Sequence, residues 1–409
     1  MKVLLVSPVP TDPLVAGNRA RIAALFAALV RLGHDVSFAY IPYETADYER
    51  MRLRLGDDRL HVLQSAPPPF PRFKGRLQRK IGRTFGLRSA HLWKVDEWFD
   101  EGLIAQVRRL QAKEFFDCVL IEYVFLSKLA THLPTSVRTI IDTHDLMGDR
   151  HKRYLDAGMT PQWFATTRAE EVSALNRADA VLAIQQDEAN YLKKTVSAEV
   201  FCVGHLVNLD IRLLPDPGGA RILFVGSANP INVQGLEWFL ELAFPRIQRE
   251  MPDCELAVAG EVSHARSWPD RLVLLGNQDS LVDAYAQAAI VINPVKFGTG
   301  LPVKTVEALT YGKPVVATSA GIRGLEDFSS AIFSADDPDA FAGRVLELLR
   351  GKNLRLTMSQ HAVAAAGEWQ RRQMTVLQNA LAGQTPAGRI KAIEPAIAQC
   401  ADEPLKFGG

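Results

Sequence analysis

Short apolar runs alternate with longer amphipathic stretches along most of the chain, and this alternation constrains the fold more than any other feature. Residues 19–31, 236–248 and 338–349 have apolar residues three and four apart, as one face of a helix requires. The apolar runs indicate buried strands at 3–6, 36–39, 118–121, 139–141, 180–184, 222–225, 256–259, 272–275, 290–292 and 315–317. Strands that are apolar on both faces are typical of parallel sheets covered by helices on both sides. The pattern therefore predicts an α/β protein.

A proline- and glycine-rich break divides this alternation into two series. Residues 213–219 read Leu-Leu-Pro-Asp-Pro-Gly-Gly, and neither a helix nor a central strand continues through such a segment. We therefore expect two doubly wound Rossmann-like domains, residues 1–212 and 220–352, joined by this linker and facing each other across a cleft. The stretch 353–385 has a helical pattern, and the tail 386–409 has little periodicity.

Composition and charge exclude several classes of protein. Of the 409 residues, 47% are hydrophobic and 23% are charged, which excludes a disordered or coiled-coil chain. The net charge of +1 gives no reason to expect a nucleic-acid partner. No apolar run is long enough for a membrane-spanning helix, and the run at the N-terminus is too short for a signal peptide. The four cysteines lie far apart without metal-binding spacing, so we expect reduced thiols in a cytoplasmic protein.

The stretch 297–309 carries the most specific chemical signal. It reads Phe-Gly-Thr-Gly-Leu-Pro-Val-Lys-Thr-Val-Glu-Ala-Leu and follows the predicted strand 290–292. Its glycines allow the backbone to approach a ligand closely, and its proline suits the first turn of a helix whose free N–H groups favour a phosphate. Lys304 and Glu307 then share one helix face, where they suit a diphosphate and the hydroxyls of a ribose. The alternative is a glycine-rich turn followed by a surface ion pair.

Together with the Tyr-Gly-Lys-Pro-Val-Val that follows, this stretch resembles the donor-binding signature of the retaining glycosyltransferases of family four, which have the two-domain GT-B fold. Further segments agree with the resemblance, namely Leu-Gly-His-Asp-Val at 32–36, Phe-Val-Gly-Ser at 224–227, Val-Gln-Gly at 233–235 and Leu-Gly at 275–276. The resemblance covers residues 1–381. It implies that residues 1–212 bind the acceptor, that 220–352 bind the nucleotide sugar, and that the helical segment 353–385 returns to the first domain.

The expected donor site departs from the family pattern at three positions. Thr299 stands where the family usually has a second glutamate, Ser227 where it has an arginine, and Gln234 where it has a lysine. We expect Lys304 and the N–H groups of the loop to replace the missing cations. The resemblance implies donor-binding roles for Gly226, Ser227, Asn277, Thr299, Gly300, Leu301, Lys304 and Glu307.

Polar residues follow the predicted strand 139–141, and ligands bind beyond the carboxyl ends of such strands. The run Asp-Thr-His-Asp ends in His144 and Asp145, and the resemblance places a catalytically important histidine at this point. We therefore expect His144, Asp145 and Glu307 to be the catalytic residues. The alternative for His144 is a structural side chain.

Two further groups are expected on the acceptor side of the cleft. Glu122 follows the predicted strand 118–121, where it contacts the acceptor or His144, or instead caps the next helix. Gly17, Asn18 and Arg19 lie where the first strand gives way to a helix, so that a close backbone approach and a cation are available there. The glycine is alternatively only part of a turn.

Residues 60–95 contain eight lysines and arginines and no acidic residue, with aromatic residues between them. Such a segment suits an anionic membrane surface, and many members of the family act on lipid-linked acceptors. We therefore expect a peripheral membrane contact through residues 70–94, at the inner face of the membrane. The alternative is a solvated helix whose charges balance acids elsewhere.

These observations predict a retaining glycosyltransferase that moves a sugar from a nucleoside diphosphate sugar to a glycan, lipid-linked or other acceptor. A helix N-terminus, backbone donors and cations are expected to stabilise the departing diphosphate without a metal or cofactor. The family resemblance implies same-face attack without a protein nucleophile. Two alternatives are a non-catalytic scaffold with a degenerate donor site and a sugar-nucleotide epimerase on the same fold, which Thr299 disfavours.

Overall fold

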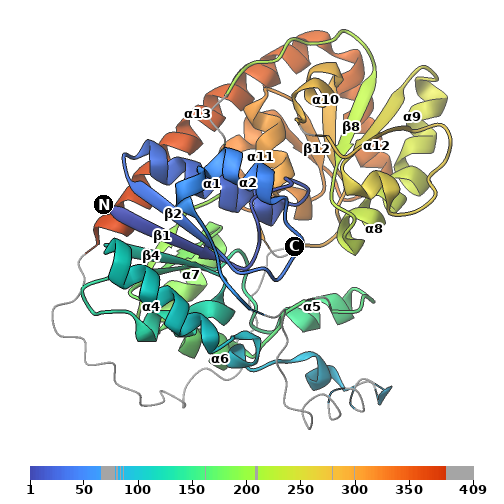
Figure 1. The fold of residues 1–409 in the computed structure, drawn as a ribbon. Helices are drawn as coiled ribbons and strands as arrows, with labels where there is room; N and C mark the ends of the chain where they lie inside the picture. Colours follow the sequence, from blue (N-terminus) through green and yellow to red (C-terminus); the bar gives the residue numbers. More distant parts are fainter. Residues whose placement is uncertain are drawn as a thin grey trace.

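The computed structural model describes residues 1–65, 79, 82, 84, 85, 87–161, 163–207, 211–278, 280–298 and 300–383. These residues form two α/β units, each built on a sheet whose neighbouring strands are parallel (Figure 1). The doubly wound α/β architecture predicted from the alternating pattern is confirmed.

The first unit contains a seven-stranded sheet in the order β3-β2-β1-β4-β5-β6-β7. The strand order reverses beside β1, and such switch points are where doubly wound sheets bind ligands. Helices cover both faces, and every residue of β4 and β5 is accordingly buried. The strands are β1 (Lys2–Ser7), β2 (Asp35–Tyr40), β3 (Leu60–Val62), β4 (Cys118–Glu122), β5 (Arg138–Asp142), β6 (Ala180–Ala183) and β7 (Glu199–Cys202).

The helices of the first unit are α1 (Gly17–Arg31), α2 (Tyr48–Leu55), α4 (Gly102–Glu114), α5 (Arg150–Asp156), α6 (Arg168–Leu175) and α7 (Gln186–Thr195). Short 3₁₀ helices occupy Asp57–Arg59, Arg88–His91, Val95–Trp98 and Val124–His132. Helix α1 follows β1, and its first residue lies at the carboxyl end of the sheet. Its start therefore faces the second unit.

The second unit contains a six-stranded sheet in the order β10-β9-β8-β11-β12-β13, which repeats the same winding. Its strands are β8 (Arg221–Val225), β9 (Glu255–Ala259), β10 (Val273–Gly276), β11 (Ile290–Asn293), β12 (Val315–Ala317) and β13 (Ile332–Ser334). Its α-helices are α8 (Pro230–Trp238), α9 (Phe244–Glu250), α10 (Val282–Gln287), α11 (Val303–Thr310) and α12 (Pro338–Arg350). Short 3₁₀ helices lie at Glu261–His264, Ala320–Ile322 and Glu326–Ala331.

The long helix α13 (Lys352–Ala382) leaves the second unit and packs along the first, as its course in Figure 1 shows. The Trp369 indole N–H donates to the carbonyl of His205 at 2.9 Å, and the Gln373 side chain accepts from the Gly204 N–H at 2.8 Å. Leu377 belongs to the hydrophobic core of the first unit. The helix therefore ties the two units together.

The structure differs from the predicted elements at four places. Strands β3, β7 and β13 were not predicted. All three lie at sheet edges, where a strand has a neighbouring strand on one side only and does not need a continuous apolar run. The predicted helix 236–248 is divided by a π-helical turn at Phe239–Ala243. Pro245 follows this turn and has no N–H to donate to the preceding turn, which accounts for the change of hydrogen-bond register.

Most of the basic segment 70–94 lies outside the described residues. Three of its basic side chains are described, and two of these pair with acids of the same chain. Arg79 binds Glu97 at 3.0 Å and stacks on Trp93, and Arg88 binds Asp156 at 2.9 Å.

Candidate active site

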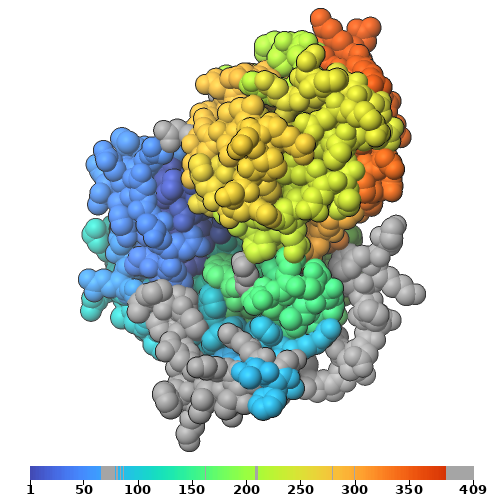
Figure 2. Space-filling model, turned by 90° about the vertical axis from the view of Figure 1, so that its right-hand side faces the viewer, coloured from blue at the N-terminus to red at the C-terminus, as the bar shows by residue number. Residues whose placement is uncertain are grey.

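A cavity of about 1360 Å³ lies between the two units, at the carboxyl ends of both sheets. Figure 2 shows the second unit, in yellow and orange, resting on the blue and green first unit. Among the described residues with a predicted site role, the cavity lining includes Gly17, Asn18, His144, Asp145, Gly226, Ser227, Asn277, Gly300, Leu301, Lys304 and Glu307. The predicted acceptor and donor residues are thus brought together in one space.

Two helix starts meet across this cavity. Neither α1 nor α11 has a side-chain cap at its N-terminus. Arg19 N–H donates to the Asn18 side chain, and Val303 and Thr305 donate to the carbonyls of Leu301 and Pro302, so the first-turn N–H groups left for a ligand are those of Gly17 and Asn18 in α1 and of Lys304 in α11. A Cβ atom built on Gly17 would lie 3.5 Å from the Val303 side chain, which places the two helix starts side by side. Asn18 donates to the Tyr123 hydroxyl at 3.1 Å. These positions suit an anion held between the units.

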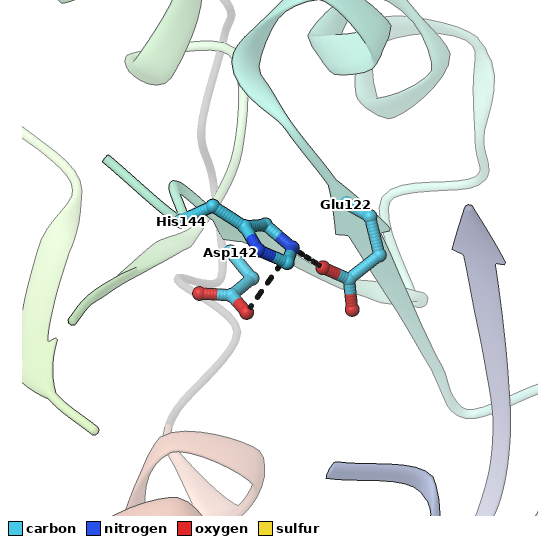
Figure 3. A group of neighbouring side chains, drawn as sticks. All are labelled: Glu122, Asp142 and His144. Carbon is cyan, nitrogen blue, oxygen red and sulfur yellow. Dashed lines mark hydrogen bonds and ion pairs between the residues drawn. The ribbon is translucent and has the colours of Figure 1, made fainter. Parts of the chain in front are cut away.

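His144 occupies a constrained position on the acceptor side of the cavity (Figure 3). Its ring Nε2 binds a carboxylate oxygen of Glu122, and its ring stacks on Tyr123 with centroids 4.1 Å apart and planes at 10°. Its backbone φ is +58°, in the left-handed region that a histidine rarely adopts. Backbone strain of this kind is concentrated at functional sites, where the surrounding structure enforces it.

Behind this histidine lies a buried ion pair that the sequence analysis did not identify. Arg21, from α1, donates to both oxygens of Asp142 at 2.8 and 2.7 Å, and to the carbonyls of Gly204 and Val203 at 2.9 Å. Burial opposes the charged form of Asp142, but Arg21 and His144 outweigh it and hold the pKa of this carboxyl below its ordinary value. The pair is therefore ionised throughout the physiological range.

Glu122 has a different electrostatic environment from Asp142. Burial, reinforced by the charge of Asp142, raises the pKa of Glu122 to about 7, although His144 and Arg21 oppose the rise. The Glu122 side chain is fully buried, so it contacts His144 and cannot itself contact a ligand in the cavity. Of the roles expected for it, contact with His144 is the one that the geometry supports.

Glu122, Asp142 and His144 each place one ligand atom within 4.8 Å of the others, which is a donor set of a kind that holds divalent cations. However, Arg21 already occupies both oxygens of Asp142, so a cation would have to displace a buried guanidinium. The chemistry of the cluster therefore fits a hydrogen-bonded support for His144 rather than a metal centre.

On the donor side, Lys304 projects from the first turn of α11 toward α8. Its ammonium donates to Asn232 Oδ1 at 2.5 Å and lies 4.6 Å from the centroid of the Phe224 ring. The Asn232 amide in turn donates to the Ser227 carbonyl at 3.0 Å. Burial lowers the pKa of Lys304 to about 7, and no carboxylate among the described residues offsets this effect. An anion in the cavity would supply the missing charge.

Glu307 lies one turn further along α11 and also lines the cavity. Burial raises the pKa of its carboxyl to about 7. Nearby, the rings of Tyr285 and Tyr311 pack with centroids 5.0 Å apart and planes tilted by 31°, and Asn277 also lines this end of the cavity. A carboxylate beside two aromatic rings is a suitable arrangement for a ribose and a flat base.

The glycine-rich loop before α11 joins the two halves of the site. A Cβ atom on Gly300 would lie 3.3 Å from the His144 carbonyl oxygen, so this glycine allows a close approach of the two units. Arg323 donates to the Gly298 carbonyl at 2.8 Å, and Phe297 packs edge-to-face on Tyr154 of α5 at 5.2 Å. Thr299 lies outside the described residues.

Two of the described residues with a predicted site role do not line the cavity, namely Glu122, which contacts His144 instead, and Arg19. Arg19 is turned into the first unit, where it donates to Glu44 at 2.9 Å and to the carbonyls of Pro13 and Thr45. The interpretation of Arg19 as an acceptor-side cation was therefore wrong, because Glu44 and these carbonyls already satisfy its guanidinium. Asp145 does line the cavity, 3.3 Å from Arg150 of α5.

Three residues that support the site, Arg21, Tyr123 and Asn232, were not predicted from the sequence. Their partners are far away in the sequence, and none of the three belongs to a recognised motif. Asn232 is the one that lies beside a segment with a predicted role. It lies just before the Val-Gln-Gly segment at 233–235, which already pointed to the donor side.

Comparison with known proteins agrees with this geometry. Residues 219–351 match the family model of "Glycosyl transferases group 1", and residues 16–200 match that of "Glycosyl transferase 4-like domain". The two matches divide the chain as the two sheets do. The fold and the two family matches define a glycosyltransferase of the two-domain GT-B type. The chain belongs to the group 1 glycosyltransferases.

Solved structures with a similar fold include three bacterial proteins. Sucrose-phosphate synthase from Thermosynechococcus elongatus has a TM-score of 0.65 at 15% identity, over 92% of this chain and 97% of that chain. The pneumococcal O-GlcNAc transferase GtfA, in complex with UDP and GlcNAc, has a TM-score of 0.62 at 10% identity, over 93% and 98%. Anabaena HepE, in complex with UDP and glucose, has a TM-score of 0.60 at 13% identity, over 94% and 100%.

A sequence relative is the "Uncharacterized 44.6 kDa protein in cps region" of Klebsiella pneumoniae. It is 30% identical over 145 residues, which span 32% of this chain and 37% of that protein. Within the described part of the chain, no helix has the length and apolar character needed to cross a membrane.

Proposed function

We propose that this protein transfers a sugar, with retention of configuration and without a metal ion, from a nucleoside diphosphate sugar to a glycan, lipid-linked or other acceptor. The observation that carries the proposal is the shared cavity. It sets the uncompensated Lys304 and the carboxyl of Glu307 opposite His144 and Asp145, with two uncapped helix starts between them.

On the donor side, the Lys304 side chain and the free N–H group at the start of α11 bind the diphosphate. They replace the cations that Ser227 and Gln234 do not provide, and they stabilise the negative charge that develops as the diphosphate departs. Glu307 accepts hydrogen bonds from the two ribose hydroxyls. Gly226, Asn277, Gly300 and Leu301 complete this half of the site, as do Ser227 and Thr299 at its edges.

On the other side, His144 binds a hydroxyl of the transferred sugar or of the acceptor, and Asp145 orients the same group. Gly17 and Asn18 allow the acceptor to approach along the start of α1. The leaving phosphate accepts the proton of the attacking hydroxyl, so the chemistry needs no protein nucleophile. UDP is the first nucleotide to test, because GtfA and HepE were both solved with it.

Calorimetric titration with UDP, GDP, TDP and CMP, without added metal, tests the donor half. Glu307→Ala should weaken binding of the preferred nucleotide by about 1–3 kcal/mol, because the ribose hydroxyls lose their acceptor. Glu347→Ala, which removes an exposed helical carboxylate paired with Arg344, is the matched control and should not change it. Failure of every nucleotide to bind would instead support the non-catalytic scaffold.

The reaction itself is tested with the preferred diphosphate sugar and candidate acceptors. Transfer should persist in EDTA, and the product should have the anomeric configuration of the donor, which NMR reads from its coupling constants. An inverted product, or activity that requires added metal, would refute the corresponding part of the proposal.

We also propose that the protein is cytoplasmic and contacts the inner face of the membrane through residues 70–94. The basic and aromatic composition of this segment supports the contact. Co-sedimentation with anionic vesicles should be lost in high salt, and neutral vesicles should not bind. Equal binding to both vesicles would contradict the electrostatic basis.

A further inference from the structure

We propose that Glu122 is a positioning residue that sets the tautomer of His144, so that Nε2 carries the proton and Nδ1 faces the substrate as a hydrogen-bond acceptor. The role of Nδ1 rests on the proposed function, whereas the tautomer does not.

The ring of His144 is held on its face and at its edge. Tyr123 stacks on one face, and Phe125 stacks behind Tyr123 with centroids 5.4 Å apart and planes at 12°. Tyr123 has a backbone φ of +71°, and its hydroxyl accepts a hydrogen bond from Asn18 at 3.1 Å. At the ring edge, Nε2 points inward to Glu122 (Figure 3). The ring therefore has one orientation.

Asp142 cannot take the place of Glu122 as the partner of Nε2. Both of its oxygens accept hydrogen bonds from Arg21, and it stays 3.7 Å from Nε2. Glu122 has no comparable cation of its own, and its second oxygen has no hydrogen-bond partner among the described residues. The carboxylate that is available to the imidazole is therefore that of Glu122.

The protonation state of Glu122 then decides the tautomer. An ionised carboxylate only accepts hydrogen bonds, so it requires the proton on Nε2 and leaves Nδ1 with a free lone pair. A protonated Glu122 instead donates to Nε2, which places the ring proton on Nδ1. In going from the first state to the second, one proton from solvent binds to Nδ1, and the Nε2 proton passes to the Glu122 carboxylate, so the N–H bond at Nε2 is exchanged for an O–H bond. A substrate hydroxyl finds an acceptor at Nδ1 in the first state and a donor in the second.

The surroundings of Glu122 place this change near neutral pH. The charged groups that face it are Asp142 and His144 from the strand β5 and its end, and Arg21 from α1; the Tyr123 hydroxyl also lies close. Burial and Asp142 together raise the pKa of Glu122 to about 7. Above this pH, the Nε2–H tautomer should dominate.

Long-range ¹H–¹⁵N NMR of protein labelled with ¹⁵N-histidine reads the tautomer directly. The chain has nine histidines, and His144→Gln identifies the signal of interest by its loss. At pH 8, the wild-type protein should show the Nε2–H tautomer, with the other tautomer growing as the pH falls through about 7. In Glu122→Gln, both tautomers should be present without this pH dependence, because the amide both donates and accepts.

A matched control is Glu171→Gln. Glu171 is another buried carboxyl of the first unit, but its oxygens accept from the backbone N–H groups of Met147 and Gly148. This variant removes a buried charge as Glu122→Gln does, and the His144 tautomer should stay as in the wild-type protein. A wild-type Nδ1–H tautomer or imidazolium at pH 8, or equal spectra in wild type and Glu122→Gln, would overturn the proposal.

Activity provides an independent measurement. Glu122→Gln should lower kcat by at least about tenfold, as expected for loss of a partner that orients a histidine. Nucleotide affinity should be unchanged, because Glu122 does not line the cavity. An equal loss of nucleotide affinity would indicate a merely structural role. If the protein bound no nucleotide, the proposed function would fail, whereas the NMR result would still decide the tautomer.

Discussion

Binding of a diphosphate should cause the protein to take up a proton, and we expect the Lys304 amine to be the group that is protonated. In the free protein this lysine has Asn232 and the Phe224 ring as neighbours, and burial lowers its pKa to about 7 from an ordinary value of 10.5. A bound diphosphate places negative charge beside the ammonium and restores its charged form. The perturbation is Lys304→Met, which keeps the length of the side chain and removes its charge.

The size of the effect follows from the pKa. The difference of about 3.5 between the two pKa values of Lys304 corresponds to about 4.8 kcal/mol of interaction free energy, at 1.36 kcal/mol per pKa unit. Water in the cleft reduces this interaction, so the value is an upper limit. At pH 8, a group of pKa about 7 is about one-tenth protonated, so binding that restores the ordinary pKa takes up about 0.9 proton. Glu307, also with a pKa of about 7, is about nine-tenths ionised at pH 8 and releases only about 0.1.

Isothermal titration calorimetry measures this uptake directly. The binding heat of UDP at pH 8, compared in Tris and HEPES buffers, gives the protons exchanged, and the terminal phosphate of UDP does not titrate at this pH. Net uptake should be about 0.8 proton in wild type and absent in Lys304→Met. Lys296→Met is the control, because Lys296 is outside the cavity and binds the Asp336 carbonyl. Tight binding without uptake, or uptake retained in Lys304→Met, would refute the reasoning.

Three further predictions concern the contacts between and beneath the two units. Gly300→Val should raise the donor KM, because the valine side chain would crowd the His144 carbonyl. Gly298→Val should leave the donor KM unchanged, because a side chain at this position has open space, and equal KM values for the two variants would contradict the prediction. A double-mutant cycle in which Phe297 and Tyr154 are replaced singly and together should give a coupling energy of about 0.5–1.5 kcal/mol for donor binding. If the effects of the two single replacements on donor affinity simply add up in the double variant, the two rings are not coupled. Arg21→Met should destabilise the fold by about 3–5 kcal/mol in urea unfolding, because Asp142 loses its buried partner, and an unchanged midpoint would contradict it.

The sequence predicted those features that depend on local pattern. The central strands are apolar on both faces because helices cover both, so short apolar runs located them, whereas the edge strands β3, β7 and β13 have no such requirement. The donor helix was identified because its glycines, proline, Lys304 and Glu307 lie within one short segment. In a short motif of this kind, the spacing of the residues along the sequence determines which of them share one helix face.

The supporting contacts of the site were not predictable in the same way. Arg21 and Asp142 are 121 residues apart, and Lys304 and Asn232 are 72 apart, so only the folded chain shows which cation meets which partner. Arg19 illustrates the difficulty, because it lies two residues before Arg21 on the same helix and is also buried, yet it binds Glu44 instead. A helix start alone does not say which of two arginines faces the cleft.

The two sides of the cleft are prepared for ligand in different ways. On the first unit, every charge near His144 already has a partner: Arg21 holds Asp142, and Glu122 holds the imidazole. On the second unit, Lys304 and Glu307 have pKa values displaced toward neutrality by burial alone. The acceptor side is therefore pre-organised, whereas Lys304 on the donor side, mostly neutral at pH 8, gains its charge when a diphosphate binds. Because this charge appears with the ligand, the electrostatic field that stabilises the departing diphosphate is strongest when a donor is bound.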